Sequence, residues 1–152
     1  MKALMILLLA GIVAPATSLL GQVQNPVHWS FTAKKLNATT YEIHLTGVID
    51  AGWHTYSQTT PDGGPVPTTI TFSANPLVTL VGKPVEVGKL DQHFEKLFGV
   101  DVKQFSNKVD FVQKITLKKP VRTNIGGSVD FMVCNDHECL PPSNQSFSVA
   151  LP

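Results

Sequence analysis

The sequence has few charged residues of either sign, and it has almost no cysteine. Charged side chains make up 15% of the 152 residues, with 12 Lys and Arg against 11 Asp and Glu, and only two residues are Cys. A chain without an excess of basic residues has no electrostatic footprint for nucleic acid or for anionic lipid. The sequence also lacks internal repeats, low-complexity tracts and charged tails. We therefore expect an ordinary folded domain with no nucleic acid among its partners.

Long apolar runs are also scarce, and the only one lies at the N-terminus. Lys2 precedes the apolar residues 3–13, and small or turn-forming residues follow as far as Gly21. This order is typical of a secretory signal peptide, and the run is shorter than the roughly 20 residues that a membrane-spanning helix needs. No cysteine lies near the expected cleavage point after Gly21, or alternatively after Ala16, so a lipid anchor is not indicated. We predict a signal peptide over 1–21 and one domain over 22–152, periplasmic or secreted and soluble after cleavage.

In the remaining chain, apolar and polar residues alternate. The alternation runs through 29–33, 41–45, 129–133 and 147–151, and further apolar runs occupy 68–73, 77–81 and 109–117. Period-two alternation is typical of half-buried strands, and the segments between these runs are rich in Gly, Pro, Asn and Asp. Seven or eight short strands with frequent turns predict an all-β sandwich.

Residues 89–99 interrupt this pattern. Leu90, Phe94, Leu97 and Phe98 are spaced so that they could line one face of a single helical turn or of a compact loop. We predict a loop here that packs down on another part of the domain.

The two cysteines follow the strand predicted to end at Val133. Cys134 and Cys139 are separated by only four residues. A structural disulfide is the plainest interpretation for an exported protein, but closing so short a loop contributes only about 2 kcal/mol on the chain-entropy model. Thiol–disulfide exchange is a second interpretation, because a close pair allows one thiolate to attack a partner's disulfide while its neighbour resolves the mixed disulfide.

Zinc is a third interpretation of the same residues. Cys134, His137 and Cys139 are suitable ligand types, and His93 could supply a fourth ligand. The spacing matches neither a paired-CxxC site nor a CxxC-HxxxH site, so we expect no metal and no small-molecule cofactor. The sequence shows no partners for the remaining histidines, which we interpret as structural: His28, His44, His54 and His93.

The segment from Phe131 to Pro142, with its Cys-Leu-Pro-Pro ending, resembles the N-terminal periplasmic domain of the bacterial thiol:disulfide interchange protein DsbD. The Gly52-Trp53-His54-Thr55-Tyr56 stretch and Phe98-Gly99 support the likeness. The resemblance implies an immunoglobulin-like fold and a protein-disulfide reductase or interchange component, with a link to cytochrome c biogenesis. Its partners would be thioredoxin-fold proteins and a membrane thiol–disulfide transporter. By resemblance, Cys139 forms mixed disulfides with partners and Cys134 resolves them.

The resemblance also implies a cap that shields the cysteines, and physical reasoning supports one, because an unshielded reductant in an oxidising compartment loses its electrons to any oxidant that reaches it. An apolar cover and the neighbouring Asp136 and Glu138 would favour protonated thiols. Trp53 and Tyr56 are either packing residues or a platform under the cysteine loop. The expected cap and its surroundings comprise Phe94, Glu95, Leu97, Phe98, Gly99, Trp53, Tyr56 and His137.

Longer members of that family continue into a transmembrane domain and a thioredoxin-like domain, whereas this sequence ends at Pro152. We therefore expect the electron donor to be a separate membrane protein or thioredoxin-like protein. Three classes of function stay open from the sequence: a redox carrier, an exported immunoglobulin-like binding module with an inert disulfide, and a small metal site.

Overall fold

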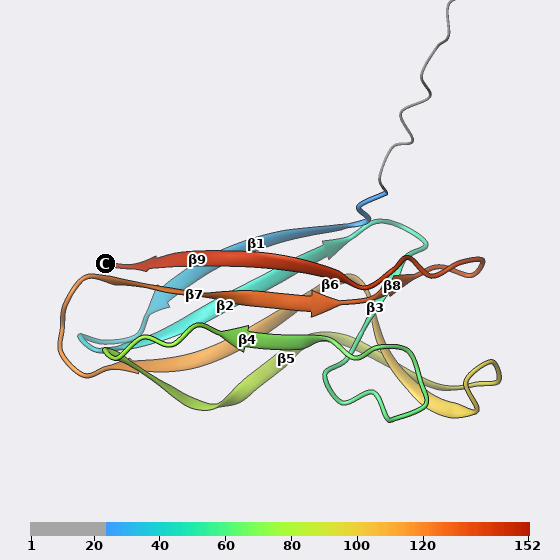
Figure 1. The fold of residues 1–152 in the computed structure, drawn as a ribbon, viewed down its shortest axis with the longest axis horizontal. Helices are drawn as coiled ribbons and strands as arrows, with labels where there is room; N and C mark the ends of the chain where they lie inside the picture. The colour runs from blue at the N-terminus through green and yellow to red at the C-terminus, as the bar shows by residue number, and fades with distance from the viewer. Residues whose placement is uncertain (1–23) are drawn as a thin grey trace, which may run out of the picture.

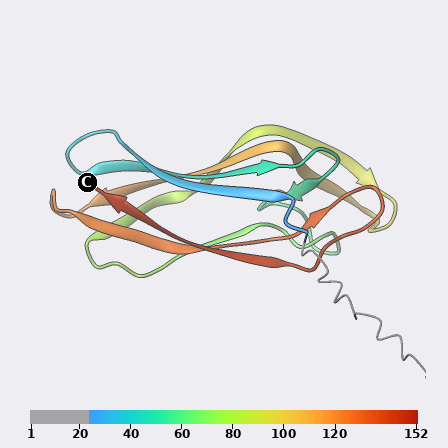
Figure 2. The same ribbon diagram turned by 90° about the horizontal axis from the view of Figure 1, so that it is seen from above.

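The computed structural model describes residues 24–152, and the predicted signal peptide lies outside the described residues. The described chain forms two antiparallel sheets that lie face to face (Figures 1 and 2). This arrangement confirms the predicted immunoglobulin-like β-sandwich. None of residues 24–152 belongs to a helix of the length and apolarity that crossing a membrane would need.

The larger sheet has six strands in the order β1-β2-β6-β3-β8, with β5 along the other edge of β6. Its long central strand, β6, pairs with β2 along residues 108–116 and with the short β3 along residues 104–106. The change of partner falls at Asn107, which has a φ of 65°. The strands of this sheet are β1 (Val27–Lys35), β2 (Thr40–Ile49), β3 (His54–Tyr56), β5 (Val78–Glu95), β6 (Val100–Leu117) and β8 (Val133–Cys134).

The smaller sheet has three strands in the order β4-β7-β9, and it packs across the larger one (Figure 2). These strands are β4 (Thr69–Phe72), β7 (Thr123–Phe131) and β9 (Ser143–Leu151). The alternating apolar residues of both sheets face each other and form the main core. Its largest fully buried members are Tyr41, Phe105, Phe111, Ile43, Leu45, Ile115, Ile125 and Leu151.

The prediction of a loop over residues 89–99 is wrong. Residues up to Glu95 form the end of β5 and pair with the start of β6, out to Glu95 opposite Val100. Only the four residues between the two strands form a turn, where Gly99 adopts a φ of 70°. A spacing of four residues places Leu90 and Phe94 on the same face of a strand as well as of a helical turn, so that spacing could not distinguish the two.

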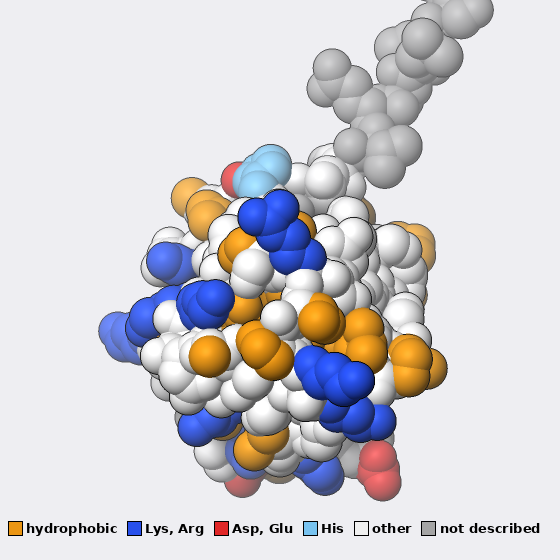
Figure 3. Space-filling view, turned by 90° about the vertical axis from the view of Figure 1, so that its left-hand side faces the viewer, with side chains coloured by type: hydrophobic (Ala, Val, Ile, Leu, Met, Phe, Trp, Pro, Cys, Tyr) orange, Lys and Arg blue, Asp and Glu red, His pale blue; other side chains and the backbone are white. Residues whose placement is uncertain are grey.

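The predicted strands over 77–81 and 109–117 are likewise parts of the two 18-residue strands β5 and β6. Together β5 and β6 form a long hairpin that extends past the sandwich, and its tip lies at the same end of the molecule as the cysteine loop (Figure 1). At the opposite end of the molecule, most of the charged side chains are Lys and Arg, and apolar side chains lie among them (Figure 3).

The chain changes sheets immediately before the cysteines. β7 belongs to the smaller sheet, Met132 lies between the strands, and β8 pairs with β3 in the larger sheet. The fully buried Thr55 hydroxyl donates a hydrogen bond to the Met132 carbonyl at 3.0 Å and so ties β3 to this crossing. The sequence predicted one continuous strand up to Val133, and the crossing is what places Cys134 on the edge of the larger sheet.

Candidate functional site

The three residues of β3 point alternately to the two faces of the larger sheet. Thr55 lies opposite both Phe105 and Val133, and all three are buried, the latter two in the main core. His54 lies opposite Cys134 and therefore shares the other, outer face with it. The first cysteine thus stands on the face of the sheet that does not contact the smaller sheet.

A second, small apolar cluster covers this outer face. Its buried members are Tyr56, Val102 and Cys134, with exposed fractions of 3%, 2% and 2%. The partly buried Phe98, Val100 and Met132 pack against them. Phe98 comes from the tip of the β5–β6 hairpin, so the hairpin tip contributes directly to the packing around the first cysteine.

The cysteines form a disulfide within a tight loop. Their Cα atoms are 4.0 Å apart, and the Asn135 side-chain oxygen accepts hydrogen bonds from the backbone amides of His137 and Glu138, both at 2.8 Å. The Leu140 amide donates to the Val133 carbonyl at 2.9 Å and closes the base of the loop. The two cysteines differ in exposure, because Cys134 is buried whereas Cys139 is exposed. An attacking sulfur from another protein therefore meets Cys139 first.

A cavity of about 670 Å³ lies between the hairpin tip and the cysteine loop. Leu97 and Phe98 contribute apolar walls, and Leu97 is itself 82% exposed. The lining residues are His54, Tyr56, His93, Glu95, Leu97, Phe98, Val102, Gln104, Cys134, Asn135, Asp136, His137, Glu138 and Cys139. The cavity gives a small molecule or a side chain of a partner a path to the disulfide.

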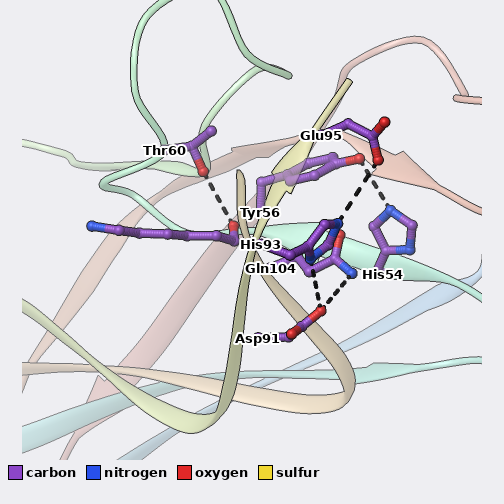
Figure 4. A network of polar contacts seen from close by, with 8 residues as sticks. His54, Tyr56, Thr60, Asp91, His93, Glu95 and Gln104 are labelled. Carbon is purple, nitrogen blue, oxygen red and sulfur yellow. Dashed lines mark hydrogen bonds and ion pairs between the residues drawn. The ribbon is translucent and has the colours of Figure 1, made fainter. Parts of the chain in front are cut away.

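One wall of the cavity carries a network of polar contacts (Figure 4). His54 Nε2 lies 3.1 Å from the Tyr56 hydroxyl. His93 Nδ1 lies 3.1 Å from an Asp91 carboxylate oxygen and its Nε2 lies 3.8 Å from Glu95 Oε2. The Gln104 amide donates to the same Asp91 oxygen at 3.2 Å. β3, β5 and β6 each contribute to this network beside the cysteine pair.

Two groups of this network have shifted pKa values. Burial lowers the pKa of His54 from its ordinary value of 6.5, and the positive charge of His93 acts in the same direction, whereas Asp136, Asp91 and Glu95 oppose the shift. Burial raises the pKa of Tyr56 to about 12, with a further contribution from Glu95. At neutral pH the phenol is therefore protonated, and the neutral imidazole is favoured.

The structure places the predicted site residues unevenly. Tyr56, Glu95, Leu97, Phe98 and His137 line the cavity together with both cysteines. Gly99 is in the hairpin turn, Phe94 is 61% exposed on the hairpin, and Trp53 packs against the main core.

His54 and His93, which we interpreted from the sequence as structural, also line the cavity. A signal for His54 was present, because in a strand it shares a face with Tyr56, two residues later. The position of His93 beside the cavity depends on the pairing of β5 with β6. The loop predicted over residues 89–99 did not include this pairing.

The zinc interpretation needs free thiolates, whereas in this structure the two sulfur atoms are joined to each other. Among residues 24–152, no group of three or more His, Cys, Asp or Glu side chains is arranged to hold a metal ion.

Known proteins resemble this chain in fold at low sequence identity. The N-terminal periplasmic domain of ScsB from Proteus mirabilis shares 16% identity with a TM-score of 0.52, over 86% of this chain and 49% of that one, so this chain spans about half of that protein's length. The Neisseria meningitidis DsbD N-terminal domain in the reduced form shares 15% identity with a TM-score of 0.50, over 74% of this chain and 85% of that one.

A complex between the DsbD and PilB N-terminal domains of the same species also matches, with 13% identity and a TM-score of 0.52, over 88% of each chain. No curated protein matches the chain significantly in sequence. The family model described as "Thiol:disulfide interchange protein DsbD, N-terminal" matches residues 22–151. The chain therefore belongs to the family of DsbD N-terminal domains.

Proposed function

We propose that this chain is a periplasmic protein-disulfide reductase that passes two electrons from the Cys134–Cys139 pair to the disulfide of an oxidised thioredoxin-fold protein. The observation that carries the proposal is the asymmetry of the pair: Cys134 is 2% exposed within an apolar cluster, whereas Cys139 is exposed at the mouth of a cavity. An exchanging pair needs one accessible sulfur and one protected neighbour close to it.

The exchange proceeds in two steps. The Cys139 thiolate attacks one sulfur of the partner's disulfide, a mixed disulfide forms, and the other partner sulfur leaves as a thiolate that takes up a proton. The Cys134 thiolate then attacks Cys139 Sγ, the Cys134–Cys139 bond forms, and the second partner sulfur leaves. The partner has gained two electrons, and this chain holds the disulfide seen in the structure.

The comparisons support a protein partner for thiol–disulfide interchange and the periplasmic compartment that we propose. The family is named for thiol:disulfide interchange, one relative is described as periplasmic, and another is in a complex with a PilB domain. We place thioredoxin-fold proteins on the accepting side and a membrane thiol–disulfide transporter or thioredoxin-like protein on the donating side. A signal peptide over 1–21 would deliver the domain over 22–152 to that compartment.

The tip of the hairpin has a protective role in this proposal. Phe98 packs against the cluster that contains Cys134, and the exposed Leu97 forms part of the cavity rim. A tip of this kind limits the access of small oxidants and moves aside for a protein partner. Glu95 and Gly99 hold the turn, because the Glu95 carbonyl accepts hydrogen bonds from the amides of Phe98 and Gly99 and Gly99 adopts a left-handed backbone. Phe94 belongs to the same segment and is exposed.

Serine variants of the two cysteines test the proposal. Cys134→Ser leaves the nucleophile without its resolving neighbour, so it should accumulate a mixed disulfide with a thioredoxin-fold protein, which non-reducing electrophoresis and mass spectrometry detect. Cys139→Ser is the matched control and should trap little. Each variant loses the same bridge, which contributes roughly 2 kcal/mol for so short a loop, and urea denaturation of both variants checks that a difference in trapping reflects chemistry and not folding.

A trap obtained only with Cys139→Ser would reverse the two roles. Capture by neither variant, together with a reduction potential below about −300 mV, would identify a structural bridge. The chain would then be an immunoglobulin-like binding module with an inert disulfide.

A further inference from the structure

The second step of the exchange requires Cys134 to lose a proton in a place that water reaches poorly. Cys134 is 2% exposed and packs with Tyr56 and Val102. The thiolate and not the thiol is the nucleophile, and apolar surroundings favour the protonated thiol. Fast resolution of the mixed disulfide therefore needs a base beside Cys134, inside the protein.

His54 is in the position that this base must occupy. It lies directly opposite Cys134 in the antiparallel pairing of β3 with β8, and directly opposite residues have Cβ atoms about 4.5–5.5 Å apart on the same face. Both side chains line the same cavity. His93 and His137 line this cavity as well, but they come from β5 and from the exposed cysteine loop, not from a strand paired with β8.

The surroundings of His54 suit a proton acceptor. The Tyr56 hydroxyl lies 3.1 Å from Nε2, so when the Nε2 proton is donated to that oxygen, Nδ1 carries the free lone pair. Burial lowers the pKa of His54 and favours this neutral form at neutral pH. Once a proton has been accepted, carboxylates from two elements stabilise the imidazolium: Asp136 from the cysteine loop, and Asp91 and Glu95 from β5.

His54 shares the cavity with further charged and polar groups, among them His137 and Glu138 of the cysteine loop. On β5, a positive charge on His93 disfavours the protonation of His54. His93 is itself paired with the carboxylates of Asp91 and Glu95 (Figure 4). β6 contributes the uncharged Gln104, and β3 itself contributes Tyr56.

We propose that His54 is the base that takes the proton of the Cys134 thiol during resolution of the mixed disulfide. The proton moves to Nδ1, the electron pair left on Cys134 Sγ forms the bond to Cys139 Sγ, and the sulfur that leaves Cys139 departs as a thiolate. The inference rests on the proposed exchange function and assigns to it a residue outside the cysteine pair.

The test uses the reduced protein and one equivalent of 5,5′-dithiobis(2-nitrobenzoate), whose coloured thiolate is released once by each step. The first release reports the attack by Cys139, and the second, unimolecular release reports resolution by Cys134. In the unchanged protein the second rate constant should rise from pH 5 and level off above about pH 7, where a histidine base is neutral. In His54→Gln the second phase should be about 10- to 100-fold slower at pH 7 and should rise about tenfold per pH unit through pH 8, as for an unassisted thiol.

The rate constant of the first phase should change less than about twofold in His54→Gln. The matched control is His28→Gln, which replaces an exposed histidine paired with Asp50. An unchanged second phase in His54→Gln would overturn the inference. If that variant does not fold, the pH dependence of the second phase in the unchanged protein tests the inference. A rate constant that rises tenfold per pH unit without a plateau contradicts a histidine base. The failure of the exchange function looks different: Cys134→Ser would trap no thioredoxin-fold protein, whatever the rates of the two phases with the small disulfide.

Discussion

The two apolar clusters of this domain lie on opposite faces of the same sheet, and they serve different needs. The main core lies between the two sheets and is built from residues such as Phe111 and Ile115, both fully buried. The second cluster has only Tyr56, Val102 and Cys134 as buried members, and a cavity of about 670 Å³ opens beside it. The first holds the fold together, whereas the second lies beside the disulfide that we propose to exchange and does not close it off. On this proposal, the residues that stabilise the fold and the residues around the exchanging bond lie on opposite faces of one sheet.

The largest effect should come from a cavity in the main core. Phe111→Ala removes a fully buried ring on β6, and a change of this kind costs about 3–5 kcal/mol. Phe98→Ala removes the same group from the partly exposed second cluster and should cost about 1 kcal/mol or less. Urea denaturation of the oxidised proteins measures both values. Equal losses in the free energy of unfolding would mean that the second cluster contributes as much to stability as the main core does.

The hairpin tip should matter more for kinetics than for stability. The double variant Leu97→Ala and Phe98→Ala opens the cavity beside the disulfide, so oxidation of the reduced pair by a small-molecule disulfide should be several-fold faster. Val85→Ala, on an exposed β5 residue far from the cysteines, is the control. If the double variant is folded and its oxidation rate is unchanged, the hairpin tip is not a cap.

The smallest effect should be a pH-dependent loss of stability on the outer face. Burial lowers the pKa of His54 below 6.5 in the folded state, so as the pH falls through 6.5 the unfolded chain binds a proton before the folded chain does. The free energy of unfolding therefore decreases over this range and is unaffected by His54 at higher pH. His54→Gln should flatten this part of the curve in urea titrations between pH 7.5 and 5, and His28→Gln should not. A curve of identical slope in His54→Gln would show that His54 is not buried as described.

The sequence was sufficient for the fold because the main core follows from period-two alternation, as at Tyr41, Ile43 and Leu45. It was also sufficient for the cysteine pair, since the two residues are close in sequence. It was insufficient for the outer face, which is assembled by pairing between distant strands. The pairing of His54 opposite Cys134 depends on the crossing of the chain between the sheets at Met132. The position of His93 depends on the register of β5 with β6. No local pattern encodes such long-range pairings.

The short length of β8 has a consequence for how the domain responds to reduction. This strand has two residues, and its backbone is held by the pairing with β3 and by the Leu140 to Val133 hydrogen bond, while the disulfide closes the loop that follows it. Local opening of a structure costs little free energy where few backbone hydrogen bonds must be broken. Loss of the disulfide therefore loosens a small unit at the edge of the sheet, while the long strands β2 and β6 continue to protect their amides from exchange with solvent. The domain can change its oxidation state, and the mobility of its cysteine loop with it, without any need to unfold and refold.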